Sequence, residues 1–228
     1  MFKHSPLKLD YEDLVCETKS TGRKYQTPEG KYYPSITTIL SLQSKKAIAA
    51  WRARVGEEEA NKISRVASNR GTAVHEMAER YVNNDPDYKK GAMPNIINDF
   101  NGIKGVLDER LGEVYGQELP LYSDYLGLAG RVDCIAKFDG KISIIDYKTS
   151  RKKKKYEWVK SYFMQECFYA IATEERTGIP ITQLVTIISV DNDDPQVFIE
   201  HRDSWDKELK RCIQEYKDHT LNQDINTK

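Results

Sequence analysis

The stretch from residue 126 to 149 constrains the fold most, because its apolar residues alternate with polar ones instead of following a helical spacing. Its two runs, residues 126–138 and 141–149, are separated by Asp139 and Gly140, a dipeptide that favours a two-residue hairpin turn. The pattern predicts two adjacent antiparallel strands. We assign no register between them, so it stays open which residues face one another.

Most of the remaining chain shows the helical spacing, in which apolar residues recur at intervals of three and four. In the longest such segment an apolar stripe runs from Ile63 to Tyr81. The expected helices cover about residues 36–42 with Ser35 as the cap, 45–83 with a break near Gly56, 95–114, 156–176 and 204–218. Further strands are expected at residues 182–191 and 196–202. This order predicts an α/β fold, with a mixed central sheet flanked by helices.

A length of 228 residues suits a single domain, residues 1–228. Within it we expect a mostly helical part at residues 35–115 and the sheet-containing core at residues 116–228. An apolar fraction of 39% allows a sizeable core and excludes a disordered chain. No apolar run approaches the roughly 20 residues that cross a bilayer, and no signal-peptide pattern is present. We therefore expect a cytoplasmic protein without a membrane segment.

Local charge, more than total charge, points to a nucleic-acid partner. The formal net charge is zero, which counts against binding through bulk charge. Residues 141–160, however, hold eight Lys or Arg residues against two acids, and the run Arg151–Lys155 lies at their centre. Such a run alone is most often a solvated loop. Its place directly after Lys148 makes it a candidate phosphate-binding segment.

The second strand of the hairpin ends in an acid and a lysine. Alternation places Ile142, Ile144, Asp146 and Lys148 on one face, with the last two about 6–7 Å apart along the strand. Phosphodiester cleavage needs such a pair, because a carboxylate can hold a divalent metal ion and a lysine can stabilise developing charge. A strand end that merely emerges into solvent can carry the same residues, so the motif is weak alone.

The first strand supplies a second acid, Asp133. It is preceded by Gly130, which permits the close approach of a backbone or a ligand. Acids on two adjoining strands suit a hard cation that prefers oxygen ligands. Without a metal ion two such acids repel each other, so we expect that removing either one does not destabilise the fold. An exposed strand end is again the alternative.

Two pairs on helices complete the set. His75 follows Gly71 by about one turn, and the missing side chain of the glycine leaves room above the imidazole, which favours a metal-ligand role. Gln165 and Tyr169 lie one turn apart on an aromatic stripe that begins at Trp158. A glutamine on such a face needs hydrogen-bond partners, which a phosphate or a metal-site acid can supply. The alternatives are an ordinary helix-edge histidine and a core glutamine bonded to a backbone carbonyl.

Four short motifs thus follow one another, namely G-x-x-x-H on a helix, G-x-x-D on a strand, D-x-K on the next strand and Q-x-x-x-Y on a helix. Their order resembles the RecB-like branch of the PD-(D/E)XK nuclease superfamily. The resemblance covers residues 71–169. Upstream, the segment YPSITTIL and the helix at Trp51 are similar to the mitochondrial genome maintenance exonuclease and to phage exonucleases.

The resemblance implies a restriction-endonuclease-like core with an N-terminal helical segment. It implies a Mg²⁺ or Mn²⁺ ion, whose ligands would be His75, Asp133, Asp146 and the backbone carbonyl of Tyr147. Lys148 would be the catalytic lysine, while Gln165 and Tyr169 would border the scissile phosphate. Glu118 matches an acidic position upstream of the G-x-x-D strand in relatives.

The cysteines argue against a second cofactor. Some members of the branch hold an iron–sulfur cluster with one cysteine near the N-terminus and three after the Q-x-x-x-Y motif. This chain has Cys16 but only Cys212 beyond Tyr169, so no cluster is expected. The four cysteines include no C-x-x-C pair, which favours reduced, structural thiols.

The resemblance makes DNA the expected partner, cut by an exonuclease at single-stranded ends during replication, recombination or repair, in a bacterial or phage-infected cell. The basic residues of the helical segment that could guide a strand are Arg52, Arg54, Lys62, Arg65 and Arg70. Two alternatives stay open, a structure-specific endonuclease on the same core and a catalytically silent nucleic-acid-binding module. The complete set of metal-site residues disfavours the second. The sequence identifies no protein partner.

Overall fold

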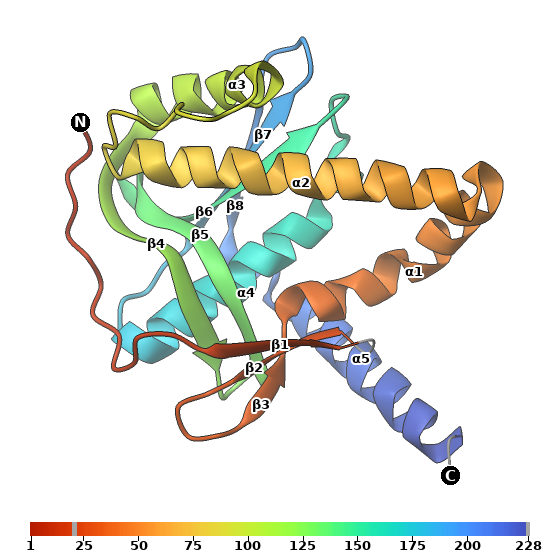
Figure 1. Ribbon diagram of the computed structural model, residues 1–228. Helices are drawn as coiled ribbons and strands as arrows, with labels where there is room; N and C mark the ends of the chain where they lie inside the picture. The colour runs from red at the N-terminus through yellow and green to blue at the C-terminus, as the bar shows by residue number, and fades with distance from the viewer. Residues whose placement is uncertain (20–21, 227–228) are drawn as a thin grey trace.

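A five-stranded mixed sheet forms the centre of the molecule, which is described here by a computed structural model (Figure 1). The structure describes residues 1–19 and 22–226, with side chains up to residue 222. The strands of the central sheet, in spatial order, are β4 (Leu111–Ser123), β5 (Leu128–Phe138), β6 (Lys141–Ser150), β7 (Gln183–Val190) and β8 (Gln196–His201). Only β6 and β7 are parallel; the other neighbours are antiparallel. The predicted mixed sheet is confirmed.

Helices cover both faces of this sheet. On one face lie α2 (Glu57–Val82) and α3 (Pro94–Arg110), whose apolar residues share a core with Cys134, Ile145 and Tyr147 of the sheet (Figure 1). On the other face lie α4 (Lys160–Thr177) and parts of α1 and α5, around a core that includes Ile144 and Leu184. The bounds of the outer helices are Ile36–Val55 for α1 and Asp206–Asn226 for α5. The predicted α/β sandwich is therefore confirmed.

A second, smaller antiparallel sheet packs beside the first. Its strands are β1 (Val15–Lys19), β2 (Gly22–Gln26) and β3 (Tyr32–Pro34). Tyr25 of this sheet shares a small core cluster with Tyr122 and Ala129 of the central sheet. The N-terminal residues thus form one wall beside β4 and β5. None of the described helices is both long and apolar enough to cross a membrane.

Local sequence signals predicted most helix ends. The Ser35 hydroxyl accepts a hydrogen bond from Thr38 N at 3.1 Å, so it caps α1 as expected. Gly56 has φ 87, which suits glycine and separates α1 from α2 at the predicted break. The two helices expected at residues 36–42 and 45–55 are one continuous helix. The segment after β6 begins with a short 3₁₀ turn, Tyr156–Trp158, before α4.

Strand β4 was not predicted, because a helix was expected to reach residue 114. The helix ends at Arg110 and the chain enters the strand at Leu111. Two register shifts against β5, around Val114 and Gly116, disturb the alternation that would have identified a strand. Pro120 is tolerated because β4 lies at the edge of the sheet.

Candidate active site

The hairpin of β5 and β6 brings the two acids together. The paired residues run from Phe138 with Lys141, next to the two-residue turn, to Cys134 with Ile145. Asp133 and Asp146 each lie one residue beyond this last pair. The turn therefore fixes the register that the sequence analysis left open.

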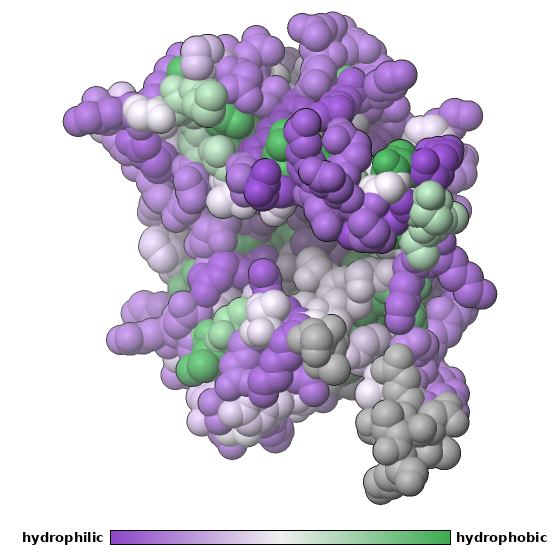
Figure 2. Space-filling view, turned by 45° about the vertical axis from the view of Figure 1, so that its right-hand side comes forward, coloured by the Kyte–Doolittle hydropathy of each residue, from purple (hydrophilic) through white to green (hydrophobic). Residues whose placement is uncertain are grey.

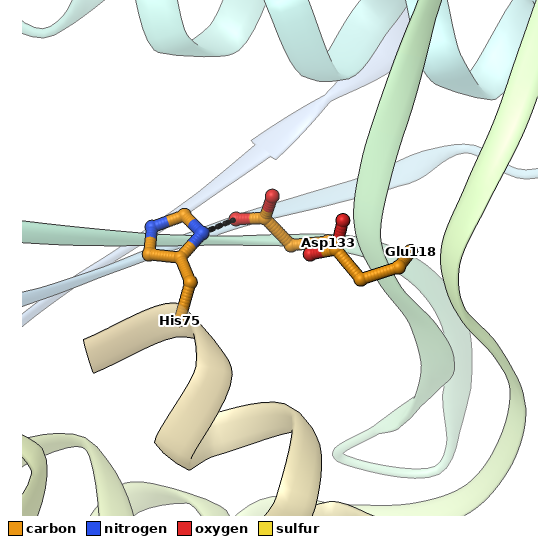
Figure 3. A group of neighbouring side chains, drawn as sticks. All are labelled: His75, Glu118 and Asp133. Atoms are coloured by element: carbon orange, nitrogen blue, oxygen red, sulfur yellow. Dashed lines mark ion pairs between the residues drawn. The ribbon is translucent and has the colours of Figure 1, made fainter. Parts of the chain in front are cut away.

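His75 of α2 reaches over the ends of both strands. Its Nε2 lies 2.6 Å from the carbonyl oxygen of Tyr147, and its Nδ1 lies 3.4 Å from Asp133 Oδ2 (Figure 3). Asp133 Oδ2 also accepts a hydrogen bond from the backbone N–H of Tyr147 at 2.9 Å. The imidazole, the first acid and the Tyr147 carbonyl thus lie within one contact network.

Glu118 of strand β4 joins this network as a third side chain. Ligand atoms of His75, Glu118 and Asp133 all lie within 4.8 Å of one another, and Figure 3 shows the Glu118 carboxylate beside that of Asp133. Glu118 has φ 50, an uncommon value for a residue with a side chain, in the irregular edge strand. The match to an acidic position upstream of the G-x-x-D strand was the only sequence signal for this residue.

The site is short of positive charge. Burial raises the pKa of Glu118 to about 7, and the neighbouring charge of Asp133 acts in the same direction. Burial also acts to raise the pKa of Asp133, but His75, Lys148 and the hydrogen bond from the Tyr147 backbone together lower it. For His75, burial acts to lower the pKa, and Asp133 raises it overall. A cation at this point would offset the repulsion between the two carboxylates.

The donor set fits a hard divalent cation. It offers two carboxylates, one imidazole nitrogen and the carbonyl oxygen of Tyr147, and oxygen ligands of this kind suit Mg²⁺ or Mn²⁺. Among the described residues, Asp146 falls outside the group whose ligand atoms lie within 4.8 Å. Its Oδ2 instead forms an ion pair with Lys148 Nζ. Three of the four ligands implied by the family resemblance, namely His75, Asp133 and the Tyr147 carbonyl, lie in contact with one another. The fourth, Asp146, is paired with Lys148 instead.

Asp146 and Lys148 form a second network on the α4 side of the sheet. Asp146 is buried, and burial raises its pKa to about 6 although Lys148 acts to lower it. Gln165 Nε2 donates to Asp146 Oδ1 at 3.3 Å and to the Tyr169 hydroxyl at 3.4 Å. Lys148 Nζ lies 5.1 Å from the centroid of the Tyr162 ring. The D-x-K and Q-x-x-x-Y motifs therefore meet, with an acid as the hydrogen-bond partner expected for the glutamine.

Gly130 and Gly71 have different structural roles. A Cβ at Gly130 would lie 2.9 Å from Tyr169 Cε1, so this glycine lets the tyrosine ring pack against the strand. The close approach expected at Gly130 thus involves a ring of the same chain. A Cβ at Gly71 would meet no atom within 4 Å, because this position faces an open cleft.

The cleft in front of the metal-ligand group has a volume of about 710 Å³. Helix α2 forms one side, the small sheet forms another, and the middle parts of β4 and β5 lie between them. Its lining residues are Cys16, Arg23, Tyr25, Gly71, Thr72, His75, Glu76, Glu79, Glu118, Arg131 and Asp133. The acids therefore open onto a space that can admit a substrate.

One family model matches most of the chain. The model of the PD-(D/E)XK nuclease superfamily matches residues 46–226. No curated protein matches the chain. Among solved structures, a protein from Eubacterium rectale with a provisionally assigned exonuclease activity is similar at 12% identity and a TM-score of 0.46. That match covers 67% of this chain and 66% of the other, just under two thirds of its length, and it carries no functional argument.

The family match covers most of the chain and contains the mixed sheet and all four motifs, two on strands and two on helices. The chain belongs to the PD-(D/E)XK nuclease superfamily.

Proposed function

We propose that this protein is a Mg²⁺- or Mn²⁺-dependent deoxyribonuclease of the RecB-like branch, which degrades single-stranded DNA from its ends in replication, recombination or repair. We further propose that residues 1–228 act as one nuclease domain without an iron–sulfur cluster. The observation that carries the proposal is the convergence of His75, Glu118 and Asp133 beside the Asp146–Lys148 pair. Phosphodiester hydrolysis needs both parts, a metal-binding set and a neighbouring lysine.

Each residue then has a role that follows from its position. The metal ion would be held by His75, Asp133 and the Tyr147 carbonyl, with Glu118 as an added ligand. Asp146 would lie next to this group, in an ion pair with Lys148. When bound, the ion lowers the pKa of a water molecule and neutralises charge on the phosphate. Lys148 would orient that water or stabilise the developing charge. Gln165 and Tyr169 would border the scissile phosphate and hold Asp146 in place.

The basic residues proposed to guide DNA differ in whether their side chains are free to contact it. Arg70 is not exposed: its guanidinium donates to Asp99 at 2.7 and 2.8 Å and also pairs with Asp191, which ties α2 to α3 and to the end of β7. Arg54 and Arg65 remain exposed. The face in Figure 2 is dominated by hydrophilic residues and is hollowed across its middle, as a strand-binding surface requires.

The test compares end-labelled linear DNA with closed circular DNA, both single-stranded, in Mg²⁺ and in EDTA. Degradation of the linear strand alone, and only with metal, is expected because an exonuclease needs an end. Cleavage of the circle would identify the endonuclease alternative. Binding without any cleavage of either substrate would identify a silent nucleic-acid-binding module and refute the proposed activity.

The basic run is expected to contribute phosphate contacts. Within the described chain, Lys153 of this run pairs with Asp193, while Gln196 holds the backbone of Lys154 through hydrogen bonds of 2.6 and 3.0 Å. The loop is thus anchored next to the strand that carries Lys148. Replacing residues 152–155 by Gln should weaken binding at low salt and flatten its salt dependence, by about 0.7 in the log–log slope per lost contact.

Fluorescence anisotropy at several salt concentrations, with Ca²⁺ in place of Mg²⁺ to suppress cutting, measures this effect. The charge control is the double variant Lys207→Gln/Lys217→Gln, since both lysines are exposed and lie on α5, outside the loop that carries the basic run. The loss should be similar for all base sequences, because phosphates carry no base identity. An unchanged salt slope would mean that the run faces away from DNA and that the strand passes over α1 and α2 instead.

A further inference from the structure

One large aromatic side chain beside the site is not used by the fold. Trp158, at the end of the 3₁₀ turn before α4, is 61% exposed, whereas the next residue, Val159, is fully buried. The neighbouring Tyr156 packs its ring against Phe163 and donates its hydroxyl to Glu200. Among the described ring contacts, that of Trp158 is with Lys155, whose Nζ lies 5.5 Å from the ring centroid.

The position of Trp158 connects it to the reacting groups. Tyr162 follows it by about one helical turn, and the ring of Tyr162 lies 5.1 Å from Lys148 Nζ. Gln165, one turn further, contacts Asp146. The segment from Trp158 through the first turns of α4 therefore leads from an exposed tryptophan to the Asp146–Lys148 pair.

Most charged residues close to this ring in the sequence are positive, with Glu157 as the exception. Lys155 lies against it, and the exposed lysines Lys152 and Lys160 are close in sequence on either side. A flat ring with flanking ammonium groups matches a nucleotide, whose base can stack while its phosphates contact lysines. An apolar protein partner would have to desolvate these lysines, so the surroundings favour a nucleic acid.

We propose that Trp158 is a base-stacking platform for the single strand that enters the site. This inference rests on the proposed function and adds a determinant of substrate class. The stacked base would lie within a few nucleotides of the bond that is cut, because the segment that carries Trp158 leads directly to Gln165 and Lys148. Bases in a duplex already stack on one another, so the platform selects unpaired strands.

The first test measures binding of a single-stranded oligonucleotide and of a blunt duplex by anisotropy in Ca²⁺. Trp158→Ala should weaken single-strand binding by about 5- to 100-fold, and Trp158→Phe should retain most of it, because a phenyl ring still stacks. Duplex binding should change little. The matched control is Tyr125→Ala, an exposed aromatic that also lies under a lysine, Lys210, but at the turn between β4 and β5.

The second test walks one abasic residue along the oligonucleotide. In the wild-type protein, an abasic residue at one position within a few nucleotides of the mapped cut should lower the affinity. In Trp158→Ala, an abasic residue at the same position should cause no further loss. Equal abasic profiles in both proteins would overturn the stacking role while the nuclease proposal stands. A wild-type protein that neither binds nor cuts single strands would refute the proposed function and this inference with it.

Discussion

Asp133→Asn and Asp146→Asn should each reduce metal-dependent DNA cleavage by about a thousandfold or more, since each removes a carboxylate from the proposed centre, where a metal ion would activate water and neutralise the phosphate. Asp133 contacts His75 and the Tyr147 backbone, and Asp146 forms an ion pair with Lys148. Cleavage of labelled single-stranded DNA in Mg²⁺ measures the effect. Asp87→Asn, in the exposed loop between α2 and α3, is the control.

The two variants should differ in stability, which revises the expectation drawn from sequence that neither acid is needed by the fold. Asn at 133 can still accept the hydrogen bond from Tyr147 N, so that variant should stay close to the wild type. Asn at 146 leaves the Lys148 ammonium without its ion-pair partner, which should cost about 2 kcal/mol or more. Thermal melts with and without Mg²⁺ measure this. Full cleavage by either variant would refute the site assignment.

Lys148→Ala should lower the single-turnover cleavage rate by about a hundred- to a thousandfold while leaving metal and DNA binding largely intact, because its proposed role is to stabilise charge in the transition state. The lysine pairs with Asp146 and lies over Tyr162, so it is held in one place. Its high pKa, raised by the nearby acids despite burial, keeps it charged.

Affinity in Ca²⁺ and single-turnover rates in Mg²⁺ separate the two contributions. Lys141→Ala is the control, because this lysine is exposed at the other end of the same strand. A collapse of DNA affinity with a normal rate for bound DNA would show that Lys148 is only a phosphate contact. A loss of cleavage in Asp146→Asn would then also have to be explained by weaker DNA binding, since Asp146 and Lys148 form an ion pair.

Much of the scaffold was predictable because its signals are local. The alternation in β5 and β6, the Asp139–Gly140 turn and the Ser35 cap each depend on residues within a few positions of one another. The turn also sets the register of the two strands that carry the acids. Strand β4 escaped prediction because its bulges break the alternation that identifies a strand.

The order of the motifs and the residue types that can bind a metal ion are evident from the amino-acid sequence. Which of these residues share one centre depends on the packing of the helices and strands. Glu118 joins His75 and Asp133 because an irregular edge strand turns it inward, and Asp146 is held by Lys148. These contacts join residues tens of positions apart, and their geometry depends on how helices and strands pack, which no local spacing specifies.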